Sequence, residues 1–226
     1  MKFNLSLCAL ILLVAQFSFA RGAIKKSGNF HAAIFGTFSP EGDLSFSKYI
    51  EGNTGSNTVT PGKAVFSTTS FTSYGAELVF SPGEFSAFSF GYVVDGQREV
   101  DYVEIDYQAG TSTRTYKYPK DLISNSAVLF NYYVTPDPTQ GYLSLGLNYS
   151  NPTWTITTAT NNKVDLKGGL GFQMAFGLAM VKGVLFEIGG KYTTIKMKYT
   201  DPTTNNFQDF GSGSVSNLTV GFKFML

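Results

Sequence analysis

Cysteine and histidine are almost absent from this chain of 226 residues, which contains one of each. Cys8 lies in the N-terminal apolar stretch, so the rest of the chain has neither a disulfide framework nor a thiolate site. A single histidine, His31, without a cysteine nearby cannot supply the usual ligands of a transition metal, and a Ser-His-Asp hydrolase would have to use it. We therefore expect no enzyme, no cofactor and no metal site.

Charged residues and long apolar runs are also scarce. Charged residues make up 15% of the chain, the same share as aromatics, and the formal net charge is +1, so the composition gives no sign of nucleic-acid binding. After the N-terminus the longest apolar stretch, GGLGFQMAFGLAMV, is regularly interrupted by glycine. This excludes a protein that crosses a membrane with helices, and the aromatic content is too high for a disordered chain.

The first twenty residues, MKFNLSLCALILLVAQFSFA, have the pattern of a secretory signal peptide. An early lysine is followed by a short apolar stretch and by Ser18-Phe19-Ala20, a small-x-small cleavage site. An uncleaved anchor would need a longer apolar core, and Leu7 is a poor residue to precede a lipidated Cys8. We expect residues 1–20 to be removed and residues 21–226 to form one exported domain.

Apolar residues occupy every second position in many segments of the exported chain. In the last one, LTVGFKFML, Leu218 and Val220 alternate with Thr219 and Gly221. Such alternation is typical of a strand with one apolar and one mixed face. The same pattern predicts eight strands, at residues 29–38, 73–80, 88–94, 128–134, 142–149, 169–178, 184–192 and 218–226.

The connections between these strands alternate between short and long. The short ones carry proline or glycine and are predicted as tight turns at 81–84, 135–140 and 180–183. The long ones are polar and are predicted as loops at 39–70, 95–125, 150–166 and 200–213. This predicts an all-β fold: an eight-stranded antiparallel up-and-down transmembrane β-barrel with short periplasmic turns and long external loops. A soluble sandwich or lipocalin-like barrel would also alternate, but it leaves the many glycines of the mixed face unexplained.

The chain resembles the small eight-stranded bacterial outer-membrane barrels of the OmpA and OmpX type over the whole exported region. The most specific part is the closing strand, where Phe222, Phe224 and Leu226 match the family's C-terminal assembly signal, although the final residue is not aromatic. The resemblance implies a monomer in the outer membrane of a Gram-negative bacterium. Its implied partners are outer-membrane lipid and the barrel-assembly machinery.

Several charged residues fall on the mixed, inward-facing side of the predicted strands. We expect a buried ionic cluster that plugs the barrel and consists of Glu77, Glu187, Lys191 and Lys223. Further polar residues at similar depth could complete its hydrogen bonds: His31, Asn131, Tyr133 and Tyr142. The alternative is four charges that point into lumen water without touching. For His31 we favour an interior polar position near the periplasmic end.

The individual function of such a barrel would reside in its loops. The segment 95–125 still alternates and predicts a hairpin above the membrane, which could shield the surface or add a strand to a partner protein. A structural or surface-interaction role, through adhesion or shielding, is therefore the first hypothesis, with a surface protein or host molecule as the possible partner. A small or gated channel is the alternative, and a lipid-modifying enzyme is less favoured.

Overall fold

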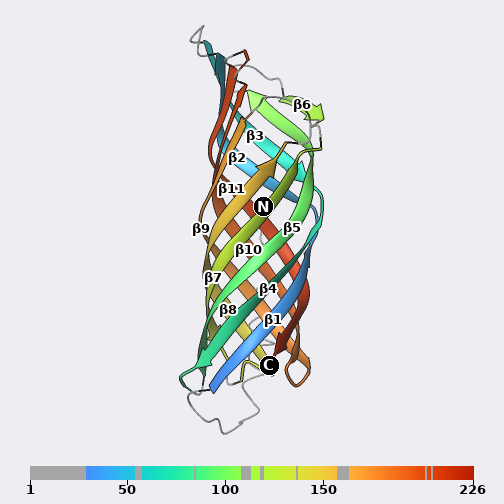
Figure 1. Ribbon diagram of the computed structural model, residues 1–226, viewed down its shortest axis with the longest axis vertical. Coiled ribbons are helices and arrows are strands. Elements are labelled where there is room, and N and C mark those ends of the chain that lie inside the picture. The colour runs from blue at the N-terminus through green and yellow to red at the C-terminus, as the bar shows by residue number, and fades with distance from the viewer. Residues whose placement is uncertain are drawn as a thin grey trace.

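The computed structural model has a β-barrel at its centre (Figure 1). It describes residues 29–53, 58–83, 85–107, 113–117, 120–135, 137–156, 163–201, 203–204 and 206–226. The predicted signal peptide lies outside these residues and stays a prediction. Within them, no helix is long and apolar enough to cross a membrane.

The described residues form eleven strand segments. The first six are β1 (Asn29–Ser39), β2 (Gly42–Asn53), β3 (Thr58–Thr68), β4 (Phe71–Ser81), β5 (Ser86–Tyr107) and β6 (Thr113–Lys117). The others are β7 (Leu122–Val134), β8 (Gly141–Thr155), β9 (Lys163–Val181), β10 (Val184–Asp201) and β11 (Asn206–Met225). All pairings between them are antiparallel.

These segments build a closed ring of eight strands in the half that carries the tight turns, and most of the wall continues beyond it, although the β8–β9 pairing ends at Tyr149 and Leu170. In the half that carries the tight turns, the order is β1-β4-β5-β7-β8-β9-β10-β11, and β1 closes the ring on β11. In the other half β2 takes the place of β1 beside β11, and β3 takes the place of β4 beside β5. Thus β1 and β2 form one interrupted wall strand, as do β3 and β4 (Figure 1). The predicted eight-stranded antiparallel barrel is confirmed.

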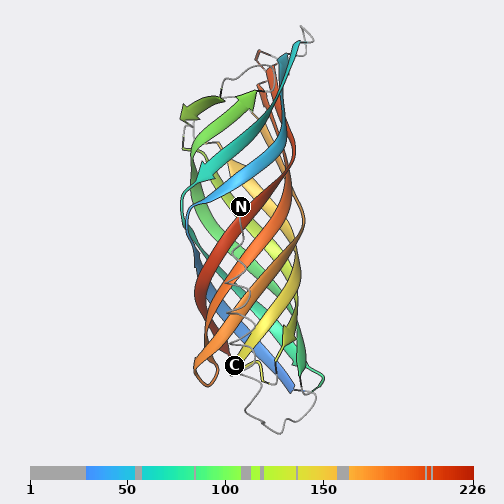
Figure 2. The ribbon, with the colours of Figure 1, turned by 180° about the vertical axis from the view of Figure 1, so that it is seen from behind.

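The four predicted long loops are wrong in extent, because most of their residues continue the barrel wall. Segment 39–70 contains β2 and β3, and segment 95–125 contains the outer part of β5 and β6 paired with it. Residues 150–155, 163–166, 200–201 and 206–213 likewise belong to strands. We call this half, with β2, β3, β6 and the strand portions beside them, the extension; the half that carries the tight turns is the turn half. Figure 2 shows the long β10 and β11 running through both halves.

The apolar face of each wall strand changes sides between the two halves. In β10, the outward residues in the turn half include Ile188 and Tyr192, whereas those in the extension include Lys196. The inward side changes the opposite way: it carries the charged Glu187 in the turn half and the apolar Met197 in the extension. A lipid-facing wall needs apolar residues outside, and a water-exposed barrel needs them inside. The turn half is therefore the membrane-spanning part, and the extension projects into water.

The outer surface of the turn half is an apolar band with aromatic residues near both edges. Leu78, Phe90 and Leu147 are each about 60% exposed, with individual values of 66%, 63% and 58%. At the edge beside the extension Phe172 and Tyr192 stack with ring centroids 5.0 Å apart. This arrangement matches the aromatic girdles of membrane barrels.

The extension has an apolar core of its own. Its inward side chains come from β2, β3, β5, β7, β10 and β11 and pack into one cluster. Phe66 lies in edge-on contact with Phe210 and Trp154, at 5.0 and 5.8 Å between centroids. The Trp154 indole donates a hydrogen bond of 2.8 Å to Asp121 Oδ2. The extension is therefore a packed domain-like end and not a set of loose loops.

The predicted tight turns lie at one end of the barrel. Residues 182–183 join β9 to β10, and Gly183 has φ +81°, a conformation that L side chains rarely adopt. In the β7–β8 turn the Thr139 amide and hydroxyl both donate to Asp137 Oδ1, at 2.9 and 2.7 Å.

At the opposite end of the barrel, hydrogen bonds from Thr204 and Thr203 lower the pKa of Asp201.

Candidate functional site: the charged lumen

Three of the four predicted cluster residues meet inside the turn half. The ammonium of Lys223 lies 2.8 Å from Glu77 Oε1 and 2.9 Å from Glu187 Oε2. The side chains of Lys223, Glu77 and Glu187 are only 5%, 1% and 11% exposed. We call these three residues the lumen triad. Alternation along the strands places all three side chains on the inner face. On the outer face at this level, their charges would lie in lipid.

Glu77 also accepts hydrogen bonds from β5 and from β7, the strand beyond it. The Tyr133 hydroxyl donates to its Oε1 at 2.6 Å, and Ser89 Oγ donates to its Oε2 at 2.9 Å. Asn131 Nδ2 donates to the same Oε2 at 3.3 Å. Both carboxylate oxygens are therefore occupied, which offsets much of the cost of burying the charge.

Glu187 is held by the second buried tyrosine. The Tyr142 hydroxyl donates to Glu187 Oε2, and the rings of Tyr142 and Tyr133 pack edge to face with centroids 4.7 Å apart. Lys223 Nζ lies 4.9 Å from the centroid of the Tyr142 ring. A cation near an aromatic face gains further electrostatic stabilisation. The lumen triad is thus packed between two tyrosines.

Each of the eight wall strands of the turn half contributes a side chain to this network. β9 contributes Gln173, whose Nε2 donates to Asn131 Oδ1 at 2.6 Å, and β1 contributes Phe35, whose ring lies 5.4 Å from Lys223 Nζ. The others, in strand order, are Glu77 (β4), Ser89 (β5), Asn131 and Tyr133 (β7), Tyr142 (β8), Glu187 (β10) and Lys223 (β11). The network therefore spans the lumen from wall to wall.

Lys191 does not join the lumen triad, which corrects the predicted four-residue cluster. Its Nζ lies 3.0 Å from Asp95 Oδ2. This ion pair lies across the lumen from the lumen triad and nearer the extension. Asp95 also accepts hydrogen bonds from Ser73 Oγ at 2.9 Å and from Asn125 Nδ2 at 2.8 Å. The lumen therefore holds two separate ionic groups.

Asp95 was missed because the predicted strand 88–94 ends just before it, whereas β5 continues to Tyr107. Its inward position follows directly from the alternation of Ser89, Gly91 and Val93, so extending that strand would have found it. Arg98, three residues later, is also buried because a bulge lies between Asp95 and Arg98. The sequence pattern carries no clear signal for that bulge.

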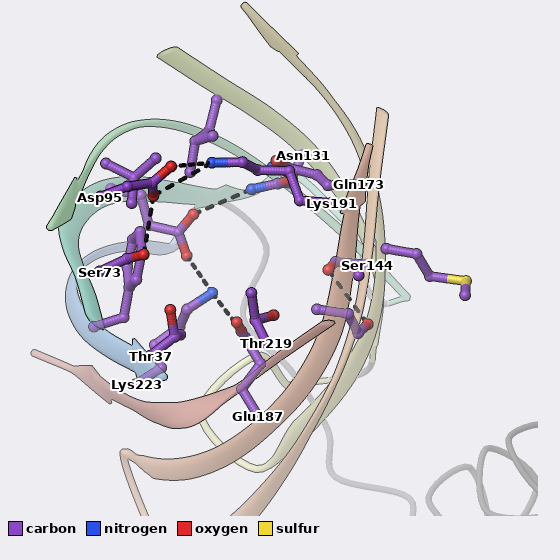
Figure 3. Close-up of a pocket in the computed structure, with 17 residues that line it drawn as sticks. Thr37, Ser73, Asp95, Asn131, Ser144, Gln173, Glu187, Lys191, Thr219 and Lys223 are labelled. Carbon is purple, nitrogen blue, oxygen red and sulfur yellow. Dashed lines mark hydrogen bonds and ion pairs between the residues drawn. The ribbon is translucent and has the colours of Figure 1, made fainter. Parts of the chain in front are cut away.

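A cavity of about 80 Å³ separates the lumen triad from the Lys191–Asp95 pair. Figure 3 shows the triad's Lys223 and Glu187 on one side, and Asp95 with Lys191 on the other. Hydroxyl and amide side chains such as Ser144, Gln173 and Thr219 also line it, together with apolar ones such as Phe35, Val93 and Leu129. A cavity of this size and polarity has room for a few water molecules.

Glycines on the inner wall create the space for these large side chains. A Cβ at Gly177 would lie 2.7 Å from ring atoms of Tyr142, and one at Gly91 would lie 2.7 Å from Glu77 Cβ. Both distances are too short for real contacts, so these positions need glycine as long as the tyrosine and glutamate keep their places. The many glycines of the mixed strand faces are explained in this way.

The remaining predicted residues lie near the turn end. His31 is half-buried on the inward side, opposite Val79 on β4. Phe222, Phe224 and Leu226 face outward and are 47%, 42% and 74% exposed. Among the described residues, no group of histidine, cysteine, aspartate or glutamate is arranged to hold a metal ion.

Comparison with known proteins gives matches only at the level of structure. No protein-family model and no curated protein matches the chain. The outer membrane protein OprG from Pseudomonas aeruginosa is 17% identical, covers 89% of this chain and 97% of its own, and gives a TM-score of 0.53. The outer membrane protein AlkL is 10% identical, with 92% and 94% covered and a TM-score of 0.49. The outer membrane protease OmpT from Escherichia coli is 8% identical, with 90% and 99% covered and a TM-score of 0.38.

The chain has the fold of a bacterial outer-membrane β-barrel. Together with the outward apolar band of the turn half, the fold places the protein in the bacterial outer membrane. The narrower likeness to OmpA and OmpX and the C-terminal assembly signal stay predictions.

Proposed function

We propose that this protein is a closed structural barrel that presents a stable, polar-surfaced extension at the cell surface, where it shields the membrane or contacts a surface partner. The observation that carries the proposal is the lumen network, which links all eight wall strands around Lys223. An eight-stranded barrel has an interior just wide enough for side chains. Here those side chains are joined by ion pairs and hydrogen bonds, and the ring of Phe35 lies beside the Lys223 ammonium.

The extension supports the surface part of the proposal. Its core is apolar, with Phe46, Phe66 and Ile195 each no more than 3% exposed, so the interior is filled there too. Its outward side chains are polar and charged, as in Lys63, Glu104 and Lys196. Such an end offers a solvated surface on a rigid support, which suits shielding or contact with another macromolecule.

Conductance in planar lipid bilayers tests whether the barrel is closed. We expect the folded protein to insert without discrete current steps, at neutral pH and at moderate voltage. Insertion is checked separately, by the shift of the folded barrel in unheated gels. Reproducible steps from a correctly folded wild-type barrel would contradict the closed-barrel proposal.

A small gated channel is the second candidate, because the cavity of about 80 Å³ already lies between the two ionic groups. Opening such a channel requires the Lys223 pairs to separate. Steps that appear only in the Lys223→Met variant would show that the lumen triad is the barrier. Steps in the wild type would favour the channel outright.

We propose no enzymatic activity for this barrel. His31 is the chain's only histidine, and it lies half-buried near the turn end. A lipid substrate in the outer leaflet would be reached at the other end of the turn half, beside the extension. Mass spectra of lipid A from cells with and without the protein test this proposal. Identical spectra are expected.

A further inference from the structure

Two lysines lie directly opposite each other on the outer face of the extension. Lys196 on β10 pairs in register with Lys167 on β9, and both side chains are exposed. Like charges at directly opposed positions of a sheet destabilise the pairing. The pair therefore costs stability unless an anion lies between the two ammonium groups.

Only one of the two lysines has a negatively charged side chain beside it in the part of the chain that the structure describes. Lys167 Nζ lies 3.3 Å from Asp165 Oδ2 on its own strand. Lys196 has Ser212 as its register partner on the other side and makes no ion pair within the ranges that the structure describes. The next outward lysine differs, since Lys198 has Asp165 and Asp209 as its register partners. Lys196 is thus the cation that lacks a counter-charge.

The lysine pair lies within reach of the lipid headgroups. Lys196 follows Tyr192, the aromatic residue at the edge of the apolar band, by four positions. With a rise of about 3.3 Å per residue and a strand tilt of about 40°, the lysine backbone is about 10 Å above that edge. The flexible lysine stem lets the ammonium reach back toward the headgroup layer, which extends about 6 Å beyond the hydrocarbon.

The surface directly below the pair suits hydrocarbon chains. On the same two strands, Phe172 and Tyr192 stack, and Leu170 is 66% exposed. One lipid molecule could therefore contact the lysines with its headgroup and the aromatic pair with its chains. Clusters of basic residues beside an apolar membrane surface bind anionic headgroups in this way.

We propose that Lys167 and Lys196 together bind the phosphate of a phosphorylated lipid of the outer leaflet, whose chains lie against Phe172 and Tyr192. The phosphate supplies the missing counter-charge and bridges the two strands. The inference uses the outer-membrane placement of the barrel and not the closed-lumen function, so the conductance result has no bearing on it.

Lipid binding is measured by native mass spectrometry of the barrel released from phosphatidylcholine nanodiscs that contain bisphosphorylated lipid A. We expect the wild type to retain lipid A, and the double variant Lys167→Gln/Lys196→Gln to bind it about tenfold more weakly or worse. The matched control is Lys63→Gln/Lys120→Gln, which removes the same charge from lysines that face carboxylates, Asp106 by register and Glu99 at 3.8 Å. The control should bind like the wild type.

Two further arms identify the lipid phosphate as the ligand. Dephosphorylated lipid A should be retained no better by the wild type than by the double variant. Millimolar inorganic phosphate should displace lipid A poorly, because it makes no contact with the apolar surface. Equal retention of both lipid forms, or ready displacement by inorganic phosphate, would overturn the proposal.

The Tm of a single variant should shift in opposite directions in the absence and in the presence of lipid A. In pure phosphatidylcholine, Lys196→Gln should raise the Tm because it removes the repulsion from Lys167. In nanodiscs with lipid A, the same substitution should lower the Tm because it removes a phosphate ligand. A shift of the same sign in both lipids would contradict a phosphate site.

Discussion

The ammonium of Lys223 lies 2.8 Å from Glu77 Oε1 and joins two strands that are not neighbours in the barrel wall. Strand β11 carries the lysine, β4 carries the glutamate, and β1 separates them. The ion pair therefore forms inside the lumen and not along the wall. Because Lys223 also contacts Glu187, one cation balances two carboxylates, and its removal leaves both without their main partner.

The first prediction concerns this shared cation. Lys223→Met should lower the free energy of unfolding by about 3–5 kcal/mol, because two buried carboxylates lose their counter-charge. Adding Glu187→Gln should recover part of the loss. Urea unfolding in lipid bilayers measures both effects, and Lys182→Met, in the exposed turn at 182–183, is the control expected to change little. Additive losses in the double variant would contradict the lumen triad.

The second prediction separates the two ionic groups. Lys191→Met should be destabilising, and Asp95→Asn should rescue it partly, because the lysine and the aspartate are each other's partners at 3.0 Å. Glu187→Gln should not rescue Lys191→Met. Double-mutant cycles on unfolding free energies distinguish the pairs, and a stronger coupling of Lys191 to Glu187 than to Asp95 would restore the four-residue cluster predicted from the sequence.

The third prediction uses one strand that crosses both environments. Leu147 and Thr153 both face outward on β8, but Leu147 lies in the apolar band and Thr153 in the extension. Leu147→Arg should cost about 2–4 kcal/mol in a bilayer, whereas Thr153→Arg should cost less than about 1 kcal/mol. Equal costs would mean that the two residues share one environment.

The fourth prediction fixes the orientation of the barrel. Short turns of outer-membrane barrels face the periplasm. A cysteine introduced at Thr203, beside the exposed end of β10, should therefore react with an impermeant maleimide on intact cells. A cysteine at Lys182, in the β9–β10 turn, should react only after the outer membrane is disrupted. The reverse pattern would invert the topology.

The sequence predicted the turn half well because its signal is strong. In segments such as 142–149, large apolar residues face lipid at every second position, and the strand cannot be mistaken for a helix. The extension was predicted as loops for the opposite reason. Its outward residues, such as Lys196, are polar, while its inward residues, such as Ile195, continue the same alternation with the apolar face reversed.

The lumen could be predicted only in part. The alternation of inward and outward positions identified Glu77, Glu187 and Lys223 as inward residues, and the three side chains do meet in the structure. The partner of Lys191 could not be found by counting from the turns, because barrel strands tilt and their register is staggered. Asp95 was in addition assigned to a loop. Depth along the axis therefore needs the pairing register, which one sequence does not supply.

The most direct test of a barrel wall and core that continue beyond the membrane uses Trp154, the chain's only tryptophan. Its ring packs edge-on against Phe66 in the core of the extension, and its indole donates to Asp121. In bilayers, its fluorescence should be blue-shifted, weakly quenched by aqueous iodide and unaffected by brominated lipid chains, and unfolding should make it accessible to iodide. Strong iodide quenching in the folded protein would mean a loop, and strong quenching by brominated lipids would place the extension in the membrane. Either result would contradict the account.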